Sequence, residues 1–176
     1  MDELLALLMS AAVQLSGLPA LDERVQVTAM SAQSMMIEIC ADLREESKRM
    51  LAQYDRCAHD PAVRREKCEE LKPDPRPYEQ CTRQSGLVAA YIIEQHRIVY
   101  RDDLNLENDV DNSFIVHEFV HALQDAYHGG RLFASCAGVI AAEQEAYAVQ
   151  QRYLHSRGQL LRVGERLRMV GCEGIR

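Results

Sequence analysis

The sequence predicts an α+β fold that is mainly helical and holds a small antiparallel sheet. Length and composition suit one globular domain over residues 1–176, because 47% of the residues are hydrophobic and 27% are charged. Several long segments have the apolar spacing of helices, whereas β-branched and aromatic residues gather in residues 86–101. The formal net charge of −7 argues against nucleic acid or an anionic membrane as a partner, since both require a basic surface.

The N-terminal segment, residues 1–16, is predicted to be an amphipathic helix that ends near Gly17 and Pro19. Asp2 and Glu3 stand where a signal peptide carries positive charge, which favours this helix over a signal peptide. No apolar run reaches the ~18 residues that a membrane-spanning helix needs, so no span is predicted.

The next part of the chain is predicted to contain a connection, a short strand, a helical segment and a long loop. Residues 18–27 lead into a short strand, and residues 31–54 have an increasingly charged, helical pattern. Residues 56–84 are polar and contain several prolines, which predicts a long loop with at most a short helix at 62–71.

The even number of cysteines in a loop-rich setting predicts disulfides, and with them a periplasmic or secreted location. Four of the six lie in the Cys- and Pro-bearing region, residues 40–85. Six cysteines allow about fifteen pairings, among which the sequence does not choose. The alternative is a cytoplasmic protein in which several cysteines are small buried apolar residues. The cysteines are Cys40, Cys57, Cys68, Cys81, Cys136 and Cys172.

Residues 86–93 and 97–101 are predicted to pair as a β-hairpin, because both are rich in β-branched and aromatic residues. The polar residues 94–96 lie between them, and an acidic loop over residues 102–111 follows.

A largely buried helix is then predicted over residues 113–127. Asp111, Asn112 or Ser113 can each cap its start, and the glycines after His128 end it.

This helix carries the motif His117-Glu118-Phe119-Val120-His121. The two histidines are four positions apart, so their imidazoles lie on one face and can bind the same ion. Glu118 follows the first histidine and can take a proton from a water at such an ion. Burying these polar groups among apolar neighbours is costly unless a cation offsets the cost. The motif therefore predicts a zinc site with Glu118 as the general base.

A third protein ligand is expected from a second apolar helix, predicted over residues 134–154, because catalytic zinc usually has three. Glu143 and Glu145 are the candidates, and they point about 200° apart on a helix, so only one can face the first helix. Glu143 borders the apolar stripe, whereas Glu145 lies on another face. Glu143 is therefore predicted to be the third ligand.

These residues resemble those of the gluzincin branch of zinc metallopeptidases. His117 to His121 matches HExxH, Ala122 to Asp125 is similar to the ALQD run that follows it in bacterial metallopeptidases, and Glu143 to Ala146 is similar to the ExxA motif. The resemblance covers residues 86–155 as a catalytic core. It implies a zincin-like domain that hydrolyses a peptide or protein substrate, with Zn²⁺ held by His117, His121 and Glu143 and with Glu118 as general base.

The chain departs from the family pattern after the ExxA motif, where Tyr147 replaces the aspartate that orients a ligand histidine in many gluzincins. Asp125 is the candidate for that supporting role, the alternative being a solvated residue at a helix end. Gln124 and Tyr127 exclude the metzincin pattern, which needs glycine and histidine at these positions. His128 is interpreted as a helix-end residue rather than a ligand.

Three matters stay open from the sequence. Either residues 97–101 or residues 86–93 would pair with an extended substrate, unless the hairpin is an ordinary part of the core. The alternative function is a non-catalytic metal-binding or partner-binding protein on the same scaffold. A donor to the oxyanion is sought among Tyr127, Tyr147, Tyr153 and His155.

Overall fold

The computed structural model is mostly helical and includes a small three-stranded mixed sheet, which confirms a mainly helical α+β fold. The sequence had predicted an antiparallel sheet, and this part of the prediction is wrong because the observed sheet is mixed. The chain divides into two compact units, Met1–Ala29 with Val88–Arg176, and Met30–Leu87. The assignment of residues 1–176 to one domain stays a prediction. The structure describes residues 2–60, 65–83, 86–165, 167 and 172.

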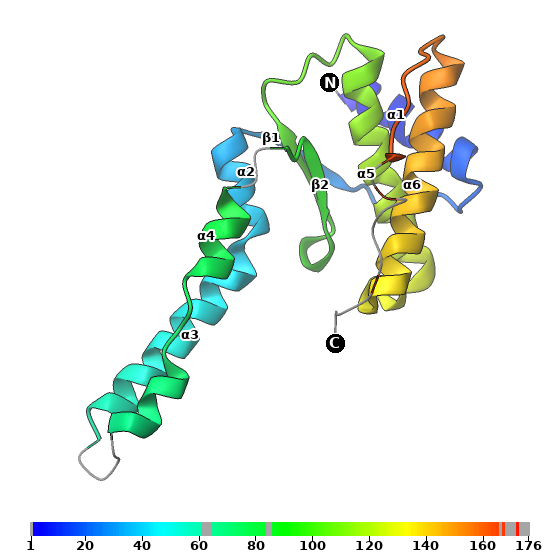
Figure 1. The fold of residues 1–176 in the computed structure, drawn as a ribbon. Helices are drawn as coiled ribbons and strands as arrows, with labels where there is room; N and C mark the ends of the chain where they lie inside the picture. Colours follow the sequence, from blue (N-terminus) through cyan, green and yellow to red (C-terminus); the bar gives the residue numbers. More distant parts are fainter. Residues whose placement is uncertain (1, 61–64, 84–85, 166, 168–171, 173–176) are drawn as a thin grey trace. The chain divides into compact units, whose positions relative to one another are not determined.

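In the first unit, helices α1 (Asp2–Ser16), α5 (Asp109–His128) and α6 (Cys136–Ser156) pack against one another. Figure 1 shows α5 and α6 side by side, with α1 behind them. The sheet has the strand order β1-β3-β2 and packs on α5. Its strands are β1 (Gln26–Met30), β2 (Ala89–Ile92) and β3 (Arg97–Arg101), and the 3-10 helices η2 (Ile93–Gln95) and η3 (Arg131–Ala134) lie in connections.

The core of the first unit is built around α5. This helix is buried almost continuously from Asn112 to Asp125, because α1, α6 and the sheet all contact it. Removing these apolar side chains from water supplies the main stabilisation of the unit. The core residues are Leu8, Ala12, Ala89, Ile98, Tyr100, Ile115, Val116, Phe119, Val120, Leu123, Ala146, Val149 and Tyr153.

Helix α5 begins four positions earlier than predicted, at Asp109 instead of 113. The cap is Asn108, whose side-chain oxygen accepts the Val110 N–H at 2.8 Å, and not one of the three residues proposed from the sequence. The predicted end is confirmed, because Gly129 adopts a left-handed φ of 65° directly after His128. Helix α6 starts after Ser135, whose side chain accepts the Gly138 N–H.

The predicted hairpin is confirmed. Strands β2 and β3 pair antiparallel, with a register that runs from Ala89 opposite Tyr100 to Ile92 opposite Arg97. His96 closes the turn at a φ of 47°, in the left-handed region that few residues other than glycine adopt.

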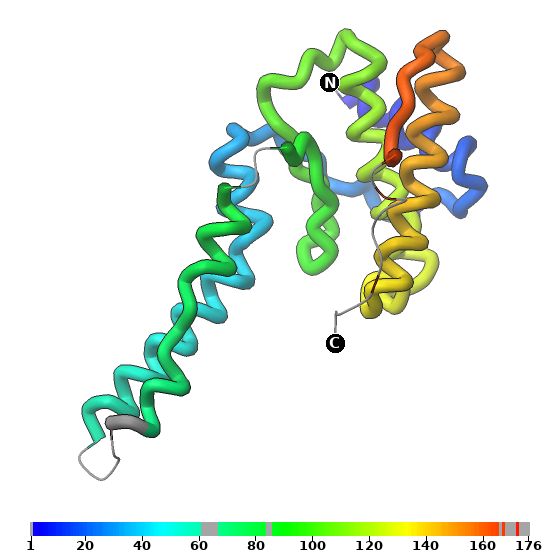
Figure 2. The backbone as a smooth tube through the Cα atoms, viewed as in Figure 1, coloured from blue at the N-terminus to red at the C-terminus, as the bar shows by residue number. Residues whose placement is uncertain are grey.

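The second unit is a helical hairpin with two legs. One leg holds α2 (Ala32–Ile39) and α3 (Ala41–Ala58), and the other holds η1 (Arg65–Leu71) and α4 (Arg76–Thr82), as the tube in Figure 2 shows. The helical prediction for residues 31–54 is confirmed. The long loop predicted over residues 56–84 is wrong at residues 76–82, which form the helix α4. Pro77 is compatible with this helix because it lies in the first turn, where a proline fits. Of the short helix expected at 62–71, residues 62–64 lie outside the described residues and the rest belongs to η1.

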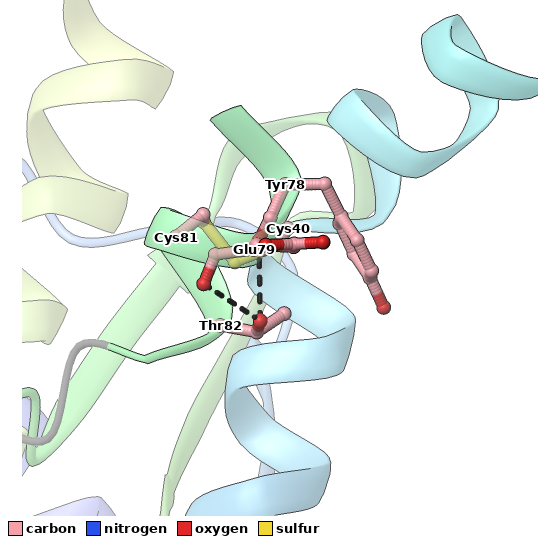
Figure 3. Close-up of a disulfide and its surroundings, with 5 residues drawn as sticks. All are labelled: Cys40, Tyr78, Glu79, Cys81 and Thr82. Carbon is pink, nitrogen blue, oxygen red and sulfur yellow. Dashed lines mark hydrogen bonds between the residues drawn. A yellow bond between two sulfur atoms is a disulfide. The ribbon is translucent and has the colours of Figure 1, made fainter. Parts of the chain in front are cut away.

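Disulfides are confirmed, and the structure supplies their pairing. Cys40–Cys81 and Cys57–Cys68 are nested and join the two legs of the helical hairpin, while Cys136–Cys172 lies in the first unit. Figure 3 shows Cys81 beside Thr82, whose hydroxyl donates to the carbonyl groups of Tyr78 and Glu79 and so closes the last turn of α4. Three disulfides indicate an oxidising environment. Among the helices that the structure describes, none has the length and apolarity to cross a membrane.

Candidate metal centre

The two histidines of the motif lie one turn apart on α5 and point their Nε2 atoms at the same place. His117 and His121 are each 6% exposed, and their Nε2 atoms are 3.1 Å apart. Two imidazole nitrogens this close require a shared proton or a shared cation between them.

Glu143 completes the cluster from α6. Its Oε2 is 3.3 Å from Nε2 of His117, and its Oε1 is 3.3 Å from Nε2 of His121. Because α5 and α6 pack side by side, the carboxylate reaches across to both rings. A third of the Glu143 side chain is exposed, so the cluster is reachable from solvent.

The alternative ligand, Glu145, lies elsewhere. Its Oε2 accepts a hydrogen bond from Nε2 of Gln124 at 2.9 Å. Within the described ranges of the chain, the group of histidine, cysteine and acidic side chains able to hold a metal ion is His117, His121 and Glu143. The structure therefore brings together the three residues that were proposed as ligands and leaves Glu145 out.

The geometry of this cluster fits zinc. A tetrahedral ion with ligands at about 2.0–2.1 Å separates neighbouring ligand atoms by about 3.3 Å. The two Nε2 atoms are 3.1 Å apart, and each lies 3.3 Å from a different oxygen of the Glu143 carboxylate. These spacings are close to that separation, so both rings and the carboxylate can reach one ion. Two imidazoles and one carboxylate are also a donor set that zinc binds in catalytic sites.

The electrostatics point the same way. Burial opposes a charged imidazole, but the neighbouring carboxylates of Glu143 and Glu118 outweigh it and raise the pKa of His121. Burial also opposes the Glu143 carboxylate, yet hydrogen bonds from His117 and His121 lower the pKa of Glu143 far below its usual range. The cluster thus favours a carboxylate held by positive charge, and a divalent cation can replace the bound proton.

Glu118, the proposed general base, is buried beside the cluster and tied to the sheet. It is 8% exposed, and its Oε2 accepts the backbone N–H of Tyr91 at 2.8 Å. In an antiparallel pair, successive residues of a strand point their N–H groups alternately toward and away from the partner strand. The Arg101 N–H donates to the Val88 carbonyl, so Val88 faces β3. Tyr91, three positions later, therefore points its N–H away from β3. The free edge of β2 therefore faces the motif helix at Glu118.

Asp125 does not support a ligand histidine, and the alternative of a solvated helix end is wrong as well. It is 5% exposed, and its Oδ2 accepts a hydrogen bond from the Tyr91 hydroxyl at 2.9 Å and lies 3.3 Å from Nδ1 of His96. Tyr91 is thus joined to α5 twice, at Glu118 by its backbone and at Asp125 by its side chain. Burial and the Asp125 carboxylate raise the pKa of the Tyr91 phenol, which stays protonated as a donor.

Of the candidates for oxyanion donor, Tyr147 lies against a proposed ligand, with its ring 4.5 Å from that of His117. Burial and the carboxylates of Glu143 and Glu118 raise the pKa of Tyr147. The other three are engaged elsewhere: Tyr153 is a core residue, His155 bonds to Gln151, and Tyr127 is 62% exposed and packs on His128.

Gln124 is the residue that sequence reasoning missed. It was considered only as a departure from the metzincin pattern, yet its Oε1 is 2.9 Å from Nδ1 of His121. His117 has no equivalent support, because its Nδ1 is buried without a hydrogen-bond partner among the residues that the structure describes. Periodicity alone offered one signal: Gln124 lies one turn after His121 on a buried helix.

Comparisons of the chain with protein-family models, with curated proteins and with solved structures found no match. The functional argument therefore depends on the residues of the site.

Proposed function

We propose that this protein is a zinc-dependent peptidase of the gluzincin type, with a zincin-like catalytic unit. His117, His121 and Glu143 would hold the zinc ion, and Glu118 would act as general base. The observation that carries the proposal is the convergence of two imidazole nitrogens and one carboxylate, at distances of 3.1 to 3.3 Å, near a buried glutamate that lies on the same helix as the histidines. A purely structural site does not need that glutamate next to its first ligand.

When bound, zinc would supply Lewis-acid polarisation of the scissile carbonyl and would acidify water. Glu118 would use Oε1 to take the proton of the attacking water, because its Oε2 is held by the Tyr91 N–H. The water oxygen bonds to the carbonyl carbon, the C–N bond breaks, and Glu118 passes the proton to the leaving amine. The carboxylate is preorganised for this transfer by its bond to β2.

The substrate would bind as an extended strand along β2. Of the two hairpin strands that the sequence left open, β3 is in the centre of the sheet and β2 is at its edge. An edge strand can pair with a peptide through backbone groups that face away from its neighbour. The Tyr91 N–H on that side is already donated to Glu118, so a peptide would pair with other backbone groups of this edge. Peptide bonds laid along this edge would pass the motif helix near Glu118.

The three disulfides favour a periplasmic or secreted protein over a cytoplasmic one. In that setting the substrate would be an exported or extracellular peptide or protein.

The test compares the purified wild-type protein with Glu118→Gln and with Glu107→Gln, an exposed glutamate of the same unit. Zinc content is measured by elemental analysis, and cleavage is measured with casein and a peptide library. We expect all three proteins to retain zinc and only Glu118→Gln to lose cleavage. Retained zinc without cleavage by any of the three would favour a non-catalytic metal-binding or partner-binding protein, and absence of zinc from the wild type would refute the proposal.

A further inference from the structure

The two ligand helices are joined at the metal site by one fully buried amide. Gln124 is 0% exposed and lies on α5, three positions after His121. Its Nε2 donates to the Ala142 carbonyl at 3.0 Å and to Oε2 of Glu145 at 2.9 Å, both on α6. These two acceptors flank Glu143 in the sequence.

This network determines which way round the amide of Gln124 lies. A carbonyl and a carboxylate can only accept, so the NH₂ group must face them and use both of its hydrogens. The amide oxygen, Oε1, is then the atom that faces Nδ1 of His121 at 2.9 Å. Because this oxygen can only accept, Nδ1 must carry the proton.

A protonated Nδ1 leaves Nε2 of the neutral ring with a lone pair directed at His117 and Glu143. A histidine that binds a metal through Nε2 needs this tautomer, and outer partners of this kind hold the ring in place at many metal sites. We infer that Gln124, anchored by Glu145 and by the Ala142 carbonyl, is the positioning residue that sets the tautomer of His121 and its spacing from Glu143. The inference rests on the proposed function, since it assumes that these residues bind zinc.

The chain offers a matched control. Gln150 is also buried, at 1% exposure, and also joins the same two helices, because its Nε2 donates to Oγ of Ser113 at 2.9 Å. No hydrogen bond joins Gln150 to a proposed ligand among the described residues. Gln124→Met and Gln150→Met therefore remove similar buried amides from the same helix pair, one at the site and one away from it.

Zinc affinity is measured by competition with a chromophoric chelator, and folding is checked by circular dichroism and urea unfolding. Loss of such an outer partner typically weakens metal binding about 10- to 100-fold. We expect a weakening of this size in Gln124→Met and unchanged affinity in Gln150→Met. Equal affinity in wild type and Gln124→Met, or equal losses in both variants, would overturn the inference.

A second measurement needs neither a variant nor zinc. Long-range ¹H–¹⁵N spectra of the metal-free wild-type protein, at a pH where the imidazole is neutral, report which nitrogen of His121 carries the proton. We expect Nδ1. A proton on Nε2, or a mixture, would overturn the inference even if the protein binds zinc. A ring held as Nδ1–H in a wild type that binds no zinc would instead support the positioning by Gln124 and refute the proposed function.

Discussion

The second unit, Met30–Leu87, depends on its nested disulfides more than on an apolar core. Helices α3 and α4 have no buried residue, and most of the stability of helices in proteins comes from the packing of a buried face. The buried hydrophobic residues that the structure describes in this unit are Met35, Met36, Cys40 and Cys68. Half of this small set consists of disulfide cysteines.

The contribution of each disulfide follows from the loop that it closes. Cys40–Cys81 has a sequence separation of 41 and Cys57–Cys68 a separation of 11. In the chain-entropy account, closing loops of these lengths stabilises the folded state by about 4 and about 3 kcal/mol. Replacing Cys40 and Cys81 by alanine should therefore lower the stability of the second unit by about 4 kcal/mol, which is close to a 10³-fold change in its folding equilibrium.

Hydrogen exchange followed by mass spectrometry measures this change locally. We expect the amides of α3 (Ala41–Ala58) to exchange up to about 10³-fold faster in the double variant, while those of α5 stay protected. The control is a double alanine variant of Cys136 and Cys172, whose separation of 36 gives a similar loop in the other unit. Unchanged protection of α3 in the variant without Cys40–Cys81 would refute the reasoning.

Three further predictions concern the first unit. Zinc at 100 times its dissociation constant stabilises a protein by about 2.7 kcal/mol, so chelation should lower the Tm in calorimetry by about 5–10 °C. Glu143→Ala should abolish tight zinc binding in a chelator titration, whereas Glu145→Ala should weaken it only about 10- to 100-fold, through Gln124. Tyr91→Phe should lower the free energy of unfolding in urea by about 1.5–3 kcal/mol, because the buried Asp125 loses a donor.

Each of these predictions has an outcome that would contradict it. A Tm that does not respond to chelation would mean that the folded state binds no zinc. A greater loss of affinity in Glu145→Ala than in Glu143→Ala would reverse the assignment of the ligand. For Tyr91→Phe the control is Tyr127→Phe, at an exposed ring, and equal stability of the two variants would show that the bond to Asp125 contributes nothing.

The parts of the site that follow local rules were predictable from the sequence. Two histidines four positions apart share a helix face whatever the rest of the fold does, and the structure places His117 and His121 accordingly. To choose Glu143, it was also necessary to infer which side of α6 faces α5. The apolar stripe of α6 indicated that side. The nearness of these three residues is therefore a consequence of helical periodicity and of one packing contact.

Contacts between distant segments were not predictable in the same way. Asp125 was assigned to the histidines because it lies one turn beyond His121, but its donor is Tyr91, 34 positions earlier in the chain. The role of Gln124 depends on a carbonyl of α6, which no spacing rule reveals. At α4 the prolines were interpreted as breakers, although Pro77 in a first turn is compatible with a helix and the Cys40–Cys81 bridge holds that helix against its neighbour.

The two histidines of the proposed zinc site have unequal support. His121 is held by a hydrogen bond from its outer nitrogen, whereas the outer nitrogen of His117 has no partner among the described residues and its ring packs against Tyr147. Tyr147 is in turn covered by Gly164, where a Cβ would come within 2.6 Å of the tyrosine ring. His117 is thus supported by packing against Tyr147, whereas His121 is supported by a hydrogen bond. The directional support lies at Gln124, beside His121, so among the partners outside the three proposed ligands we expect a substitution there to weaken zinc binding most.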